Sequence, residues 1–185
     1  MALLFHDELL AAVEGILFAA SEPLSLERIA QILEVNREDA LELVEILTTQ
    51  YQAQHRGIQV VELAGGYQMS TRPELAAYIE RMYKPQFHSL SHAALEALAI
   101  IAYKQPVTRG EIEVIRGVQS DRAVATLVDK NLVKEVGRKE GPGRPVLFGT
   151  TDEFLKHFGL KDLTDLPTQE EIILSSSDDE PGTPV

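Results

Sequence analysis

The 185-residue sequence contains no cysteine, no long apolar run and few basic residues. The absence of cysteine excludes disulfide bonds, thiolate metal sites and thiol chemistry. No apolar run approaches the ~20 residues that a membrane-spanning helix needs, and the apolar N-terminal stretch is interrupted by Asp7, Glu8 and Glu14. We therefore expect a cytoplasmic protein without a membrane segment.

Basic residues are scarce and unevenly placed. The chain has 17 Lys and Arg against 29 Asp and Glu, a formal net charge of −12, which argues against general binding to nucleic acid. Residues 165–185 hold six acids and no base, whereas residues 103–144 hold nine bases and six acids. A locally basic region thus lies within an acidic chain whose hydrophobic content of 44% is sufficient for globular cores.

An internal repeat is the clearest positive feature. The stretch ILFAASEPLSLERIAQILEV (16–35) aligns without a gap with AIIAYKQPVTRGEIEVIRGV (99–118), an offset of 83 residues. Pro23 then falls on Pro106, Ser25 on Thr108 and Ile29 on Ile112, although only part of the aligned positions are identical. We infer that one supersecondary unit occurs twice.

Each unit is predicted to contain three helices followed by a β-hairpin. Apolar residues at helical spacing define the helices, and short polar residues at their starts are typical N-caps. The predicted caps are Ser25, Asn36, Ser91, Thr108 in the capping box TRGE, and Ser120 or Asp121. The predicted buried positions are Leu9, Leu10, Val13, Ile16, Leu17 and Ala20; Leu26, Ile29, Ile32 and Leu33; Ala40, Leu43, Leu47 and Tyr51; Leu95, Leu98, Ala99 and Ala102; and Val124, Leu127 and Val128.

This order of elements predicts the fold. The hairpins are expected around Gly65 and Gly66 and on either side of RKEGPGRP (138–145), and extra helices are expected at 73–83 and 151–158. The fold class is mainly α with small β-hairpins (α+β), in tandem winged-helix domains. The expected boundaries are 1–83 and 91–166 for the domains, 84–90 for a linker and 167–185 for a disordered acidic tail.

The basic loop at 138–145 has three interpretations. A phosphate-binding loop fails on spacing, because Pro142 stands where a Walker motif needs a backbone donor and GPGRP lacks the third glycine of a dinucleotide fingerprint. A basic wing tip could contact the DNA backbone or an acidic partner. A plain hairpin turn is the simplest interpretation.

Nothing in the sequence marks a catalytic, cofactor or metal site. GxSxG is absent, and His88 and His92, although four residues apart, lack the glutamate of HExxH. The expected recognition helix pairs Arg122 and Lys130 with Asp121 and Asp129, which makes it a poor reader of bases. We therefore predict a non-enzyme without cofactors that acts as an interaction scaffold.

Two long motifs resemble a known family. LEALAIIAYKQPVTRGEIEVIRGVQSD (95–121) and LVKEVGRKEGPGRPVLFGTTDEFLKHFGLKDLTDLP (132–167) closely resemble the segregation and condensation protein B (ScpB) family, and VEGILFAASEPLS and GGYQMSTRPE are similar to it too. The resemblance implies a homodimer through the N-terminal domain that binds the kleisin ScpA. With an SMC ATPase, such a complex acts in chromosome condensation and segregation at the nucleoid, so that DNA association is indirect or weak.

Within this hypothesis the C-terminal domain binds the kleisin. The candidate contacts are Tyr103, Lys104, Pro106, Val107, Arg144, Pro145 and Leu147. Tyr103 offers apolar area with a polar tip, and Arg144 can pair with carboxylates. Dimerisation is expected through the first and third helices of the first unit. Two other functions stay open: a tandem winged-helix transcription regulator, and an enzyme accessory with a cryptic nucleotide site.

Overall fold

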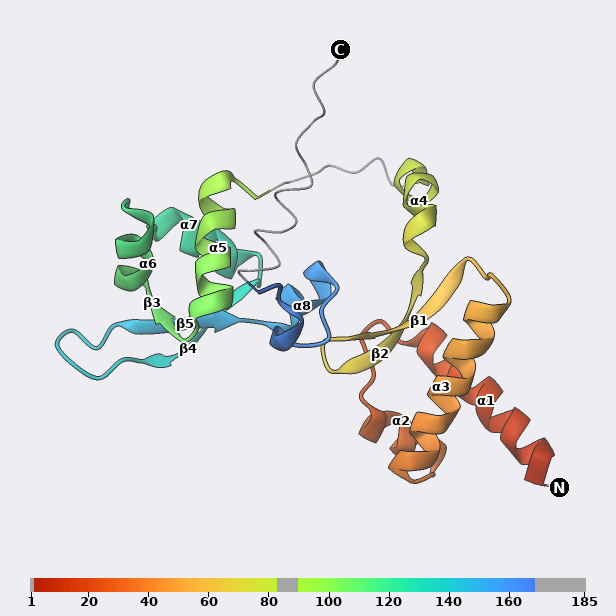
Figure 1. Ribbon diagram of the computed structural model, residues 1–185. Helices are drawn as coiled ribbons and strands as arrows, with labels where there is room; N and C mark the ends of the chain where they lie inside the picture. Colours follow the sequence, from red (N-terminus) through yellow and green to blue (C-terminus); the bar gives the residue numbers. More distant parts are fainter. Residues whose placement is uncertain (1, 83–89, 169–185) are drawn as a thin grey trace, which may run out of the picture.

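The chain folds into two units that lie side by side (Figure 1). The computed structural model describes residues 2–82 and 90–168, without the side chains of residues 2–5. Each unit has its own cluster of buried apolar side chains, one within residues 13–60 and one within residues 94–154. Both units combine three helices with a small antiparallel sheet, which confirms the predicted winged-helix fold class. His88 and the predicted acidic tail from residue 169 lie outside the described residues.

The first unit follows the predicted order of helices and hairpin. Ser25 and Asn36 accept hydrogen bonds from the backbone amides of Arg28 and Asp39, which confirms both predicted caps. The four side chains predicted as the buried face of the third helix are all buried. The elements are α1 (Ala2–Ala19), α2 (Leu26–Leu33), α3 (Arg37–Ala53), β1 (Ile58–Leu63), β2 (Gly66–Thr71), η1 (Pro73–Leu75) and α4 (Ala76–Met82).

The second unit repeats this order and adds a strand. The hydroxyl of Thr108 accepts from the amide of Glu111, and the Glu111 carboxylate accepts from the amide of Thr108, so the predicted capping box is confirmed. Ser91 caps the first helix, as predicted. The elements are α5 (His92–Lys104), β3 (Val107–Thr108), α6 (Arg109–Arg116), α7 (Asp121–Asp129), β4 (Val133–Arg138), β5 (Val146–Thr150), α8 (Asp152–Phe158) and η2 (Leu163–Asp165).

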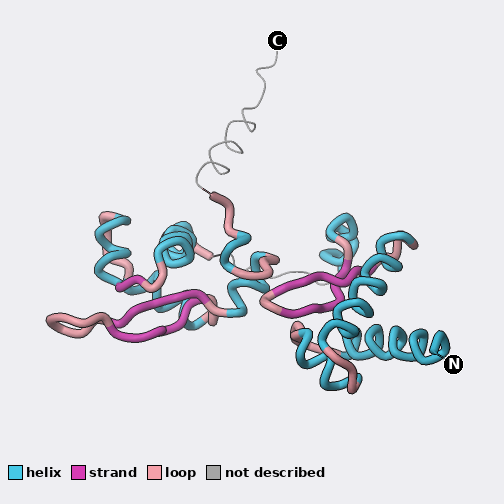
Figure 2. Tube along the Cα trace, turned by 60° about the horizontal axis from the view of Figure 1, so that its bottom comes forward, coloured by secondary structure: helices cyan, strands magenta, loops and turns pink. Residues whose placement is uncertain are grey.

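The two sheets differ in strand number and in the length of their turns. β1 and β2 are joined by Ala64 and Gly65, both with positive φ, which is the geometry of a tight primed turn. In the second unit the strands are ordered β3-β5-β4, and β4 and β5 are joined by the long loop that Figure 2 shows projecting beyond the sheet. The basic loop at 138–145 is therefore the second wing.

The repeat keeps its offset of 83 over the second helix and the residue that follows it. α2 and α6 have the same bounds at this offset, and each is followed by a residue in the left-handed region, Glu34 and Gly117. The first helices do not keep it. Val13 and Leu17 match Ala97 and Ile101 in burial, an offset of 84, and the turns that follow differ in length, since α1 ends four residues before Pro23 and α5 two residues before Pro106.

Several predicted buried positions are wrong. In α5, Leu95 and Ala99 are exposed, and Ala94, Ala97 and Ile101 take their places in the core. α5 is apolar on most of its surface, so that sequence periodicity does not determine which side faces the core. Ile32 at the end of α2 and Val128 at the end of α7 are 41% exposed, whereas Ile29 and Leu127 on the same helices are fully buried.

The tip of the first hairpin meets the end of the second unit. The amides of Ala64 and Gly65 donate to the carbonyls of Leu160 and Lys161, each over 3.0 Å. The Lys161 ammonium lies 3.0 Å from the Glu62 carboxylate, and Lys156 pairs with Glu22. In Figure 1 the contact lies beside α8, between the two units.

In the part of the chain described, no helix combines the length and apolar character that crossing a membrane requires.

Candidate functional site

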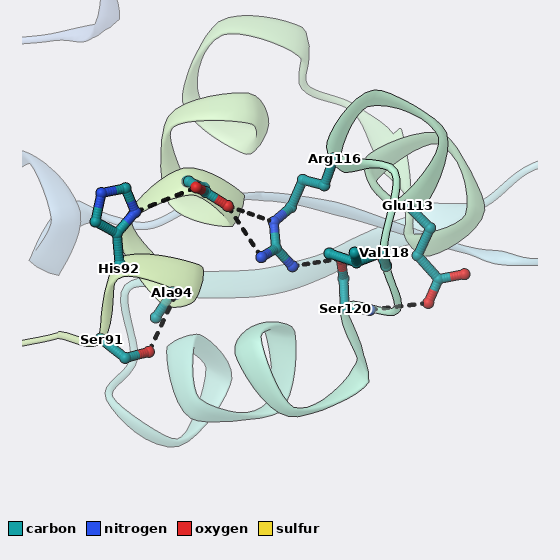
Figure 3. A network of polar contacts seen from close by, with 8 residues as sticks. Ser91, His92, Ala94, Glu113, Arg116, Val118 and Ser120 are labelled. Carbon is teal, nitrogen blue, oxygen red and sulfur yellow. Dashed lines mark hydrogen bonds and ion pairs between the residues drawn. The ribbon is translucent and has the colours of Figure 1, made fainter.

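A nearly buried arginine fixes the helix-turn-helix of the second unit (Figure 3). The Arg116 side chain, only 6% exposed, donates from Nε and a terminal nitrogen to the Glu96 carboxylate on α5, each over 3.0 Å. Its other terminal nitrogen donates to the Ser120 hydroxyl over 2.8 Å. The Ser120 amide in turn donates to the Glu113 carboxylate over 3.1 Å. The network therefore ties α5, α6 and the start of α7 together.

This network also sets the charge of Glu96. The guanidinium of Arg116 hydrogen-bonds the carboxylate and holds the pKa of Glu96 below its ordinary value, with a smaller effect from His92. Hydrogen bonds between charged partners are among the stronger ones in proteins. α6 is thereby held with its outer face turned away from the core.

That outer face is unusually apolar. Val114 is 83% exposed and Ile115 is 54% exposed, whereas Ile112 on the inner face is fully buried. Val118, just after the helix, is 56% exposed. A helix advances by about 100° per residue, so the aliphatic residues at 112 and 114 cannot share one face. α6 must therefore present an aliphatic surface outside its own core.

This surface forms one wall of a groove beside the second wing. The groove has a volume of about 440 Å³ and is lined by Thr108, Gly110, Glu111, Val114, Ile115, Lys139 and Pro145. At Gly110 an added Cβ would meet no atom within 4 Å, so the missing side chain leaves open space there. The groove thus has aliphatic walls, a glycine and a charged rim.

An ion pair joins the wing to the capping box of α6. The Lys139 ammonium lies 2.6 Å from one Glu111 oxygen, while the amide and hydroxyl of Thr108 donate to the other oxygen over 2.8 Å each. Together, the Lys139 contact first and the Thr108 bonds next, these interactions lower the pKa of Glu111 to about 2. Glu111 therefore stays ionised and holds wing and helix in one arrangement.

The predicted contact residues at the end of α5 have different surroundings. Lys104 and Pro106 are exposed. Tyr103 is 45% exposed, and its hydroxyl donates to the carbonyl of Pro167 over 2.7 Å, so its polar tip is used within the chain. Val107 is only 4% exposed and pairs with Phe148 in the sheet, so it belongs to the core and not to the surface expected for it.

The predicted contacts in the wing lie nearer the groove. Pro145 lines it, and Leu147 is half-buried on β5 opposite Thr108. Arg144 is exposed with φ 40°, and in the described chain its guanidinium has no carboxylate partner. The structure therefore places Pro145 in the groove, with Arg144 next to it in the chain and Leu147 paired with the lining residue Thr108.

Sequence analysis missed the residues of α6 that form the groove wall. Gly110, Val114, Ile115 and Lys139 were not among the predicted contacts. A signal was available, because EIEVIR places three aliphatic residues within four positions of an eight-residue helix. Such a short helix cannot bury all of them against one core.

Across residues 2–82 and 90–168 no group of three or more His, Asp or Glu side chains is placed to hold a metal ion. His92 contacts Glu96 over 3.1 Å. On α7, Asp121 is paired with Arg109. The helix carries acidic as well as basic side chains, as expected from the sequence.

Comparison with known proteins gives one consistent result. A family model described as segregation and condensation complex subunit ScpB matches residues 11–169. Segregation and condensation protein B of Desulforamulus reducens is 53% identical over 174 residues, which cover 94% of this chain and 96% of the relative.

Two solved structures of ScpB proteins are similar to this chain in sequence. ScpB from Mycobacterium tuberculosis is 31% identical and covers 84% of this chain and 97% of its own, with a TM-score of 0.42. A dimer of an ScpB N-terminal domain complexed with a ScpA peptide is 39% identical over 41% of this chain and 95% of that domain, with a TM-score of 0.40. From the family model and the curated relative, this chain belongs to the family of the segregation and condensation complex subunit ScpB.

Proposed function

We propose that this chain is a non-catalytic subunit of a bacterial SMC–ScpA–ScpB complex. In this role it binds the kleisin ScpA and acts in chromosome condensation and segregation, at the nucleoid and without a cofactor. The observation that carries the proposal is the aliphatic groove of the second unit in a chain of the ScpB family. An exposed apolar groove with a charged rim is the surface that a protein partner covers.

The groove suits a kleisin segment that carries both apolar and acidic side chains. Val114, Ile115 and Pro145 can bury aliphatic groups, and Arg144 can pair with a carboxylate beside them. Lys104, Pro106 and Leu147 extend the contact along the turn and β5. Tyr103 contributes ring surface, because its hydroxyl is bonded to Pro167. Val107 acts only by holding β3 in the sheet.

Titration of ScpA fragments against variants of the full chain tests this site. We expect Val114→Asp to weaken binding at least tenfold, because it places a charge in an apolar contact, and Arg144→Ala to weaken it a few-fold. Gln31→Asp is the matched control, since residue 31 occupies the position of Val114 in α2. Unchanged affinity in a folded Val114→Asp variant contradicts the site.

The first unit is proposed to form the homodimer, with domain boundaries at 1–83 and 91–166. Phe18 on α1 is 77% exposed, although it lies beside the fully buried Leu17 and Val13. Such an aromatic side chain on a small domain is typical of a protein contact. Sedimentation of Phe18→Asp at micromolar concentration tests this, and an unchanged dimer would remove α1 from the interface.

DNA association is proposed to be indirect. In α7 and the wing, acidic residues accompany the basic ones, and Arg109 and Lys139 are already paired with carboxylates. A tandem winged-helix regulator would instead bind one operator with a steep dependence on salt, because each phosphate contact releases a counterion. Binding of duplex DNA at physiological salt with such a slope would favour the regulator.

A further inference from the structure

The groove between α6 and the second wing needs an occupant with aliphatic and acidic side chains. Two aliphatic side chains of its wall, Val114 and Ile115, are largely exposed to solvent on a helix of only eight residues. Beside it, Arg138 and Arg144 form no ion pair with any described residue. Within residues 2–82 and 90–168, the Arg138 guanidinium donates to the carbonyl of Arg144 over 3.3 Å. Two cationic groups therefore remain available for carboxylates.

A segment with this chemistry lies in the same chain, outside the described residues. Residues 169–185 read QEEIILSSSDDEPGTPV, in which one aliphatic triplet, 172–174, stands between two glutamates and a later acidic run. No basic residue follows Lys161. The order acid, aliphatic, acid complements an aliphatic groove with cations at its side.

The chain leaves the described structure on the second unit itself. The carbonyl of Pro167 is held by the Tyr103 hydroxyl over 2.7 Å, in the last turn of α5. From there α5 leads through a short turn to Thr108, which lines the groove. Ile172 lies four residue steps after Thr168, a stretch of chain that extends at most about 14 Å. A short flexible tether that spans the distance between its two sites gives an effective concentration on the order of millimolar.

We propose that residues 170–180 of this chain dock in the groove, with Ile172, Ile173 and Leu174 against Val114, Ile115 and Pro145 and with the acids toward Arg138 and Arg144. The proposal deepens the function proposed above, since the tail would then compete with ScpA for one surface. Because a bound tail and a bound kleisin exclude each other, the tail lowers the apparent affinity by the fraction of time that the groove is filled.

A spin-label experiment tests the docking without any kleisin, so that this proposal and the proposed function can fail separately. The chain has no cysteine, so Ser176→Cys gives a single attachment site for a nitroxide in the full-length protein. We expect the methyl signals of Val114 and Ile115 to be lost in the oxidised sample and recovered on reduction. Ile32, the counterpart of Ile115 in α2, is the internal control and keeps its signal.

Two variants and one mixture make the result specific. Ile172→Asp combined with Ile173→Asp removes the aliphatic contact, and Gly110→Gln fills the groove while favouring the helix, so each should restore the Val114 and Ile115 signals. Retention of these signals in the original labelled chain, or equal loss at Ile32, overturns the proposal. Signal loss when spin-labelled chain is mixed with unlabelled, isotope-enriched chain assigns the tail of a second copy, which overturns docking within one chain.

Discussion

The two winged-helix units share a frame and differ in what holds the frame together. At the offset of 83, Ile29 and Ile112 are both fully buried, and the N-caps Ser25 and Thr108 correspond. Arg116, however, corresponds to Leu33, which packs against the apolar core of the first unit. One unit therefore fixes its second helix with apolar contacts, and the other fixes it with a charged network that leaves the outer face of α6 free for aliphatic residues.

The largest expected effect tests what the units share. Ile29→Ala and Ile112→Ala should each destabilise their own unit by about 3 kcal/mol, because both remove a fully buried side chain and leave a cavity. Native-state hydrogen exchange of amides in each unit measures the two losses separately. A loss below about 1 kcal/mol at either site would mean that the two cores are not equivalent.

The next effect separates the two ways of holding the second helix. Arg116→Ala should cost about 2 kcal/mol, because it removes hydrogen bonds to Glu96 and Ser120 from a nearly buried side chain. This cost should shrink in high salt, since Glu96 is half-exposed and can be solvated. Leu33→Ala in the first unit is the control, and its cost should not shrink in salt. Urea unfolding at two ionic strengths makes the comparison.

A third prediction concerns the residue that ends each second helix. Glu34 (φ 56°) and Gly117 (φ 73°) occupy the same left-handed position. Glu34→Gly should stabilise the first unit by up to about 1 kcal/mol, and Gly117→Ala should destabilise the second by about as much. No atom lies within 4 Å of a Cβ built on Gly117, so the backbone conformation is the sole cost. Thermal unfolding midpoints that move in the same direction for both variants would contradict this explanation.

The smallest expected effect depends on pH. The pKa of Glu111 is lowered from 4.5 to about 2 by Lys139 and Thr108. The folded state therefore favours the carboxylate, and this stabilisation is complete above pH 4.5 and is lost as the pH falls toward 2. The counterpart of Glu111 in the first unit is Arg28, which carries no carboxyl group. A carboxyl carbon NMR titration checks the value, and a midpoint near 4.5 would show that the Lys139 contact is absent in solution.

Local chemistry made much of the fold predictable. Ser25, Asn36, Ser91 and Thr108 act as caps because a hydroxyl or amide oxygen within three residues of an unpaired amide needs no tertiary partner. These caps depend on neighbours in sequence, and they came out as predicted. The hairpin expected around Gly65 and Gly66 is present, but its turn lies one residue earlier, at Ala64 and Gly65, and Gly66 pairs with Leu63.

The remaining features depend on contacts between distant segments. The buried side of α5 is decided by packing against α6 and α7, because the helix is apolar nearly all round. The first helices of the two units correspond at an offset of 84 and not 83, and the turns that follow them differ in length. The groove combines α6 with a wing about thirty residues later, and only the folded chain brings Val114 and Pro145 together.

The contact between the first hairpin and the end of the second unit has its own consequence. Its two central hydrogen bonds join main-chain amides of Ala64 and Gly65 to main-chain carbonyls of Leu160 and Lys161. Such bonds do not depend on which side chains are present, because every residue has a backbone carbonyl and every residue except proline has a backbone N–H. The junction between the units can therefore stay the same while the amino acids that form it change.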